Sequence, residues 1–101
     1  MDYGLTDKVV LINGSTGGIG QALCRAFAGE GCRLAISSTS QAKLDAFVPT
    51  LEISEDKLFT SVVDVTEEAQ VKAWIDSAYE RFGKIDVVIP NAGYEGKYQE
   101  I

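Results

Sequence analysis

Short runs of apolar residues along this chain are separated by longer segments in which apolar residues recur every third or fourth position. The runs predict β-strands and the recurring pattern predicts helices. We expect strands at Lys8–Ile12, Arg33–Ser37, Leu58–Val63 and Ile85–Ile89, with a helix in each interval. Strands that alternate with helices form right-handed βαβ units, so the pattern predicts an α/β protein with a parallel sheet.

The first helix is expected from about Gly18 to Ala28, before a pair of glycines. Its apolar residues have the i, i+3, i+4 spacing of one helix face, which predicts that they face the core. These residues are Ile19, Ala22, Leu23, Ala26 and Phe27.

Ser40 is expected to cap a short second helix that carries Leu44, Phe47 and Val48, with Pro49 near its end.

Thr66 is expected to cap the third helix, whose first turn holds Glu67 and Glu68 where the helix dipole favours negative charge. Gly83 ends this helix. Its predicted buried stripe is Val71, Trp74, Ile75, Ala78, Tyr79 and Phe82.

A glycine-rich stretch, Gly14–Gly20, joins the first strand to the first helix. Unpaired backbone N–H groups and the positive end of the helix dipole point into such a loop, which predicts a site for an anion such as a pyrophosphate. Glycine allows the close backbone approach that a Cβ would block. The alternative is a turn whose glycines serve packing alone. The candidate phosphate-binding residues are Gly14, Ser15, Thr16, Gly18, Ile19 and Gly20, with the Ile19 side chain expected in the core.

This stretch resembles the Gly-x-x-x-Gly-x-Gly cofactor loop of the short-chain dehydrogenase/reductase family, and the sequence that follows is similar to its 3-oxoacyl carrier-protein reductases. Two further motifs occur in the family's order, at Asp64-Val65 and Asn91-Ala92-Gly93. Asn13 and Pro90 depart from the usual threonine and asparagine at their positions. The resemblance implies a partial Rossmann-like doubly wound parallel sheet, strand order 3-2-1-4, with the ligand at the carboxyl ends of strands 1 and 4.

The resemblance also implies roles for the two later motifs. The carboxylate of Asp64 would accept a hydrogen bond from the adenine amino group, and Val65 would pack beside the base. Asn91, Ala92 and Gly93 would lie along the cofactor's ribose. Both motifs could instead be plain turns, and a strand-ending aspartate can also cap a helix.

The end of the second strand bears on the choice of cofactor. NAD-specific Rossmann domains carry a carboxylate about 20 residues past the glycine loop, yet no acidic residue lies between Glu30 and Asp45. The hydroxyls of Ser38 and Thr39, with Lys43 one turn away, suit a phosphate, so NADP is favoured and NAD stays possible. A capped polar loop without a ligand role is the alternative.

Catalysis in the resembled family uses a tyrosine with a lysine four residues later, because the lysine lowers the tyrosine pKa. No Tyr-x-x-x-Lys occurs here, so no catalytic residue is assigned. We therefore expect residues 1–101 to be one dinucleotide-binding domain, the N-terminal part of an NAD(P)-dependent oxidoreductase with a small-molecule substrate. The full enzyme is expected to be a homo-oligomer. The alternative is a free-standing, non-catalytic nucleotide-binding or subunit-interaction module.

The composition of the chain limits its possible partners and binding sites. A net charge of −6 argues against nucleic acid or an anionic membrane as a partner. The N-terminus does not resemble a signal peptide, and no apolar run is long enough to span a bilayer, so we expect a cytoplasmic protein. Cys24 and Cys32, without any histidine in the sequence, predict two reduced and partly buried thiols and no metal site. Gln21 stands where an ATP-binding P-loop requires lysine, and a methyltransferase stays possible on fold grounds alone.

Overall fold

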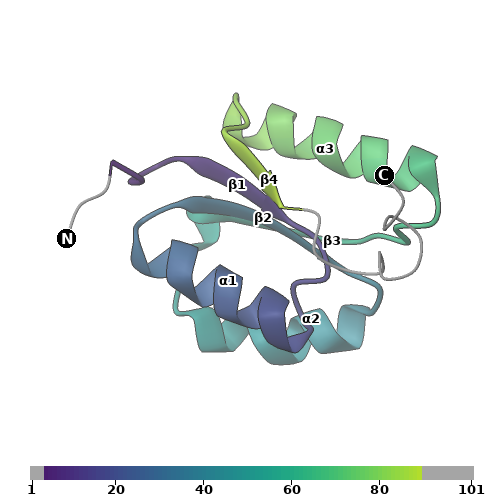
Figure 1. Cartoon of the computed structure of the whole chain (residues 1–101), viewed down its shortest axis with the longest axis horizontal. Helices are drawn as coiled ribbons and strands as arrows, with labels where there is room; N and C mark the ends of the chain where they lie inside the picture. The colour runs from purple at the N-terminus through teal and green to yellow at the C-terminus, as the bar shows by residue number, and fades with distance from the viewer. Residues whose placement is uncertain (1–3, 90–101) are drawn as a thin grey trace.

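The computed structural model describes residues 4–89, in which parallel strands form one sheet in the order β3-β2-β1-β4. Figure 1 shows the elements along the chain. They are β1 (Val9–Ile12), α1 (Gly18–Gly29), β2 (Arg33–Ser38), α2 (Gln41–Phe47), the 3-10 turns η1 (Val48–Leu51) and η2 (Glu55–Lys57), β3 (Leu58–Val62), α3 (Glu68–Phe82) and β4 (Val87–Ile89). The predicted fold class and strand order are confirmed.

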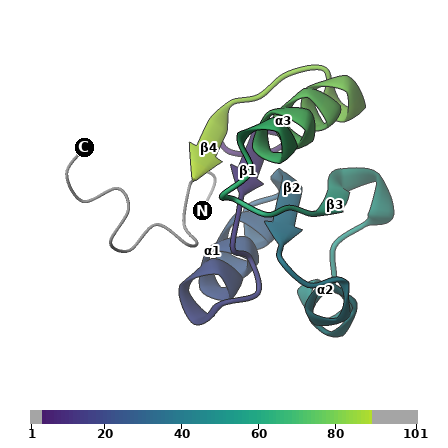
Figure 2. The ribbon, with the colours of Figure 1, turned by 90° about the vertical axis from the view of Figure 1, so that its right-hand side faces the viewer.

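The helices form a layer on each side of the sheet, with α1 and α2 on one face and α3 on the other (Figure 2). Parallel register aligns Ile12 with Ile36 and Ile89, and Ile36 with Thr60. All four strands therefore reach their carboxyl ends at the same edge of the sheet, and this edge carries the glycine loop.

Continuous burial of the two central strands explains why they read as unbroken apolar runs. Val10 and Ile12 of β1 pack with Leu34 and Ile36 of β2 in the core beneath α1 and α2. The alternate residues Val9, Leu11 and Ala35 pack with Trp74 and Ala78 of α3.

The buried face of α1 differs from the prediction. The side chain of Ile19 is 70% exposed, and Ala22 and Ala26 are exposed too. Gly20 and Cys24 are buried instead, and Leu23, Phe27 and Ala28 are partly buried against the core. The prediction for Ile19 was wrong because the contact of Gly20 with the preceding loop sets the rotation of the helix, which turns Ile19 outward.

The start of α3 also differs. Glu67, not Thr66, is the N-cap residue, and it makes no side-chain capping bond. The hydroxyl of Thr66 donates to Asp64 Oδ1 at 2.6 Å, so its hydrogen-bonding capacity goes to the turn before the helix. Tyr79 is 56% exposed, contrary to its place in the predicted stripe.

The predicted cap of α2 is confirmed. Ser40 caps α2, since its side chain accepts a bond from the N–H of Lys43. Cys24 and Cys32 are free thiols, and both are fully buried, more deeply than the partial burial that the sequence predicts. Across residues 4–89, no group of histidine, cysteine or acidic side chains could hold a metal ion, and none of the helices has the length and hydropathy to cross a membrane.

Candidate functional site

Gly14 in the loop after β1 and Gly18 and Gly20 in the first turn of α1 have different structural roles. Gly14 has φ +64°, a left-handed conformation that residues with a Cβ rarely adopt. A Cβ on Gly20 would lie 2.1 Å from the carbonyl oxygen of Gly14, so only glycine lets the helix approach the loop this closely. A Cβ on Gly18 would meet nothing within 4 Å. Gly14 and Gly20 thus fix the loop, while Gly18 borders open space.

Hydrogen bonds hold this loop against the end of β2. The N–H and the hydroxyl of Ser15 both donate to the carbonyl oxygen of Ser37, at 3.0 and 2.9 Å. The hydroxyls of Thr16 and Ser38 lie 2.9 Å apart. Gln21 donates from its amide to the carbonyl oxygen of Thr16 at 2.9 Å. Hydrogen bonds within the chain therefore fix the position of this loop, which forms a cradle at the start of α1.

The N-terminus of α1 is suited to an anion. The first intrahelical bond runs from the N–H of Gln21 to Gly17, at 2.8 Å, so the N–H groups of residues 18–20 have no acceptor within the helix. Gly17 supplies no side-chain cap, and the first turn contains no acidic residue. The positive end of this twelve-residue helix is left uncompensated by its own side chains, which favours a negatively charged group there.

Asp64 and Val65 follow β3 at the same edge of the sheet. Asp64 Oδ1 accepts bonds from the N–H of Thr66 at 2.9 Å and from its hydroxyl, while the N–H of Asp64 donates to Gln70. The aspartate thus forms a turn of the kind that the sequence allowed as an alternative. Asn91, Ala92 and Gly93 lie outside the described residues.

Ser38 and Thr39, the two residues predicted to bind cofactor at the end of β2, differ in their exposure to solvent. Ser38 is 3% exposed, and its hydroxyl also accepts a bond from the N–H of Ser40 at 3.2 Å. Thr39 is exposed. Beside them, a cleft of about 320 Å³ separates α1 from α2. Its lining residues, none of them acidic, are Thr16, Gln21, Arg25, Lys43, Ala46, Phe47 and Thr50.

Cys24, the thiol nearest the loop in sequence, is not a candidate nucleophile. Burial raises the pKa of its thiol to about 12, so the reactive thiolate is scarce at neutral pH.

Comparison with known proteins agrees with this geometry. A family model described as short chain dehydrogenase matches residues 8–101. The chain belongs to the short-chain dehydrogenase family. Members of this family are oxidoreductases, and the match includes the glycine loop and both later motifs.

Among individual relatives, a levodione reductase of Leifsonia aquatica is 44% identical over 94 residues, covering 91% of this chain and 35% of the relative. A 3-oxoacyl-[acyl-carrier-protein] reductase of Thermotoga maritima is 36% identical, covering 88% and 36%. A short-chain dehydrogenase/reductase of Burkholderia phymatum in complex with NAD superposes with a TM-score of 0.77 at 30% identity, covering 85% and 31%. The chain thus spans about a third of the length of these relatives.

Two contributors to this short-chain dehydrogenase site were missed by the sequence analysis. The carbonyl of Ser37 anchors Ser15, and the side chain of Gln21 holds Thr16. A main-chain acceptor leaves no trace in a sequence. Gln21 does carry a signal, because a polar side chain one turn into a helix lies close enough to bond back to the loop that precedes it.

Proposed function

We propose that this chain forms the cofactor-binding part of an NADP(H)-linked short-chain dehydrogenase/reductase, which transfers hydride between the nicotinamide and a carbonyl or alcohol group of a small substrate. The observation that carries the proposal is the open space at Gly18 beside the uncompensated N-terminus of α1. A pyrophosphate needs both close backbone approach and unpaired N–H donors, and this position supplies both.

In this proposal the remaining residues orient the dinucleotide along the carboxyl edge of the sheet. Thr16 and the N–H groups of residues 18–20 bind the phosphates, while Ser15, whose N–H and hydroxyl both donate to Ser37, holds the loop in position. Asp64 and Val65 receive the adenine, and Asn91–Gly93 border the ribose. Bound NADP(H) would supply the hydride, while the chain's own residues bind and position the cofactor.

The preference for NADP over NAD rests on charge. A carboxylate beside the adenosine ribose would repel a 2′-phosphate, and residues 31–44 contain none. Lys43 and Arg25 both line the cleft next to Thr16, and neither forms an ion pair within the described part of the chain. A phosphate on the ribose would therefore meet positive charge there.

Titration with NADPH, NADH, ATP and S-adenosylmethionine tests the proposal. We expect NADPH to bind more tightly than NADH, and ATP and S-adenosylmethionine to bind weakly. The variant Gly18→Val should abolish dinucleotide binding while staying folded, because its side chain enters open space that the pyrophosphate needs. Failure of all four ligands to bind the folded chain, or an unchanged NADPH affinity in Gly18→Val, would overturn the phosphate role of this loop.

The 101 residues contain no Tyr-x-x-x-Lys, so we expect them to bind cofactor without reducing a carbonyl substrate. Turnover of NADPH with a carbonyl compound, lost on mutation of a residue in this chain, would contradict that expectation. Size-exclusion chromatography of the whole protein tests the expected homo-oligomer, and cell fractionation tests the expected cytoplasmic location.

A further inference from the structure

The strand β3 lies at an open edge of the sheet. Its one strand neighbour among residues 4–89 is β2. The N–H of Val63 donates to Ser38 of β2 at 2.9 Å, and successive residues of a strand direct their backbone groups to opposite sides. The backbone groups of Thr60 and Val62 therefore point outward. The strand Leu58–Val62 contains no charged residue and no proline, the usual protection of an edge.

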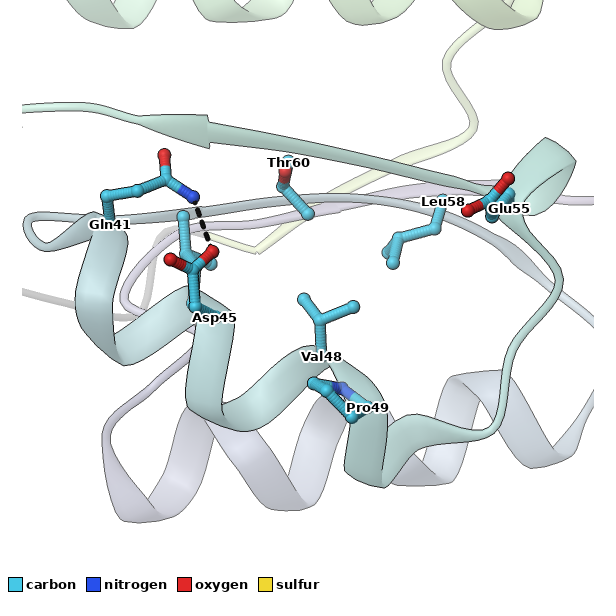
Figure 3. Close-up of a pocket in the computed structure, with 8 residues that line it drawn as sticks. Gln41, Asp45, Val48, Pro49, Glu55, Leu58 and Thr60 are labelled. Carbon is cyan, nitrogen blue, oxygen red and sulfur yellow. Dashed lines mark hydrogen bonds between the residues drawn. The ribbon is translucent and has the colours of Figure 1, made fainter.

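A pocket of about 380 Å³ follows this edge, between β3 and α2 with η1 (Figure 3). Its walls include the apolar residues Leu44, Val48, Pro49 and Leu58. Val48 and Leu58 point toward one another across the pocket in Figure 3. An apolar side chain carried by a strand added to β3 would enter between them.

Acidic residues stand at the two ends of the pocket, Asp45 on α2 and Glu55 on η2 (Figure 3). Gln41 donates to Asp45 Oδ1 at 2.9 Å. Within residues 4–89 neither carboxylate forms an ion pair. The two nearby cations have other partners, because Lys57 pairs with Asp7 and Arg81 donates to the main-chain oxygen of Glu55. The ends of the pocket thus attract positive charge.

A second hollow, of about 200 Å³, lies on the opposite face of the same edge, between the end of β3 and α3. Ser61, Val62 and Gln70 line it together with Trp74. The indole N–H of Trp74 is buried and has no hydrogen-bond partner in the described structure. Side chains at alternate positions of an added strand would face this hollow, because successive residues point to opposite faces.

We propose that the outer edge of β3 is a docking site for an extended segment of a partner protein, with a basic, an apolar and a basic residue at alternate positions. Residues two apart in a strand lie about 6.6 Å apart on one face. That pattern sets the apolar side chain between Val48 and Leu58 and the basic ones toward Asp45 and Glu55. Main-chain bonds to the edge supply affinity, and the pockets supply specificity. A second copy of this chain is a poor occupant, because this edge is acidic and the net charge is −6.

A fluorescent peptide, acetyl-Thr-Lys-Thr-Leu-Thr-Lys-Thr-amide, is the probe, and its anisotropy reports binding to the full chain. The matched control peptide carries glutamate in place of both lysines. We expect saturable binding of the basic peptide below about 1 mM and none of the acidic one. Because this site is separate from the glycine loop, the test does not depend on the proposed function.

Variants of the chain locate the binding. Asp45→Asn and Glu55→Gln should each weaken the peptide about threefold, the effect of one exposed ion pair. Thr60→Pro removes an outward N–H and should weaken it about fivefold. Glu80→Gln, a change of an exposed acid on α3, should leave the affinity unchanged. Circular dichroism verifies that each variant is folded, and the two charge variants decide the question if Thr60→Pro does not fold.

Four results would overturn the proposal. These are no saturable binding of the basic peptide, equal binding of the acidic peptide, unchanged affinity in the folded charge variants, and an equal loss in Glu80→Gln. Light scattering measures whether the chain associates with itself in the absence of peptide. If the chain alone self-associates and Thr60→Pro abolishes this association, the occupant of the edge is a second copy and the proposed partner is wrong.

Discussion

Substitution of Gly20 by alanine tests whether the cradle depends on backbone contact. The new Cβ would lie 2.1 Å from the Gly14 carbonyl oxygen, 2.8 Å from Ser15 Cα and 2.9 Å from the Gly14 carbonyl carbon. All three atoms belong to the main chain, so no side chain can rotate away. Either the loop or the start of α1 has to move by about 1 Å.

The expected loss of stability follows from these contacts. Overpacking of this kind costs about 1–3 kcal/mol, and displacement of the loop also weakens the two bonds from Ser15 to Ser37 and the bond between Thr16 and Ser38, each worth about 1 kcal/mol. Alanine recovers up to about 1 kcal/mol through its higher helix propensity. We therefore expect Gly20→Ala to lower the free energy of unfolding by about 2–4 kcal/mol.

Urea unfolding followed by circular dichroism measures this loss. At a slope of about 1.5 kcal/mol per molar urea, the midpoint should fall by about 2 M. Gly18→Ala and Gly29→Ala are matched controls in the same helix, because a Cβ at either position meets nothing within 4 Å. Their midpoints should stay the same or rise. A Gly20→Ala midpoint equal to that of the controls would show that the contact between Gly20 and Gly14 does not hold the loop.

Three further predictions concern other parts of the chain. Ser38→Asp should shift the ratio of the NADPH and NADH dissociation constants toward NADH, because a carboxylate there repels a phosphate that carries about −1.5 to −2 charges; an unchanged ratio would place the ribose elsewhere. The N–H of Val9 donates to Asp86 Oδ2 at 2.8 Å, which holds the pKa of that carboxyl below its ordinary value of 3.8. The stabilisation that the ionised carboxylate gives to the fold is therefore complete above pH 3.8, and it is lost as the pH falls through the lower pKa of the folded state. Asp86→Asn should flatten that acid dependence in unfolding experiments, and a profile identical to the parent's would refute this assignment. Glu52 has a left-handed backbone conformation, with φ 52°, which glycine adopts more easily than glutamate. Glu52→Gly should therefore raise the free energy of unfolding by about 0.5 kcal/mol, and a lower free energy of unfolding in urea titrations would contradict this prediction.

The strands could be predicted from their apolar runs, whereas the strand order came from the resemblance to the short-chain dehydrogenase/reductase family and is confirmed by the structure. β1 is buried throughout, and β2 is buried from Leu34 onward, which explains the apolar runs Val9–Ile12 and Leu34–Ile36. Strand ends were less certain. β4 begins at Val87 and not at Ile85, because the main chain and carboxylate of Asp86 bond to Val9 before the ladder starts.

The buried faces and the caps of the helices were harder to predict, because one residue type can serve two different interactions. A threonine before a helix, for example, can cap the helix or bond within the preceding turn. Thr66 is a good capping residue in isolation, yet its hydroxyl bonds to Asp64 and Glu67 takes the cap position. Tyr79 continues the apolar spacing of α3, yet its side chain is 56% exposed, so the spacing alone does not show which residues of the stripe are buried.

The glycine loop shows most clearly where inference from sequence ends. The spacing of Gly14, Gly18 and Gly20 predicts a phosphate-binding turn, but it does not distinguish a glycine needed for conformation from one needed for packing or from one that borders open space. The structure separates them, since Gly14 has a positive φ, Gly20 has the 2.1 Å contact and Gly18 has open space. The same contact explains the error at Ile19, because a helix held by a backbone contact at Gly20 cannot turn to bury the residue before it. Spacing alone therefore predicts the position of the loop, while the rotation of α1 depends on the close contact that the absence of a Cβ at Gly20 allows.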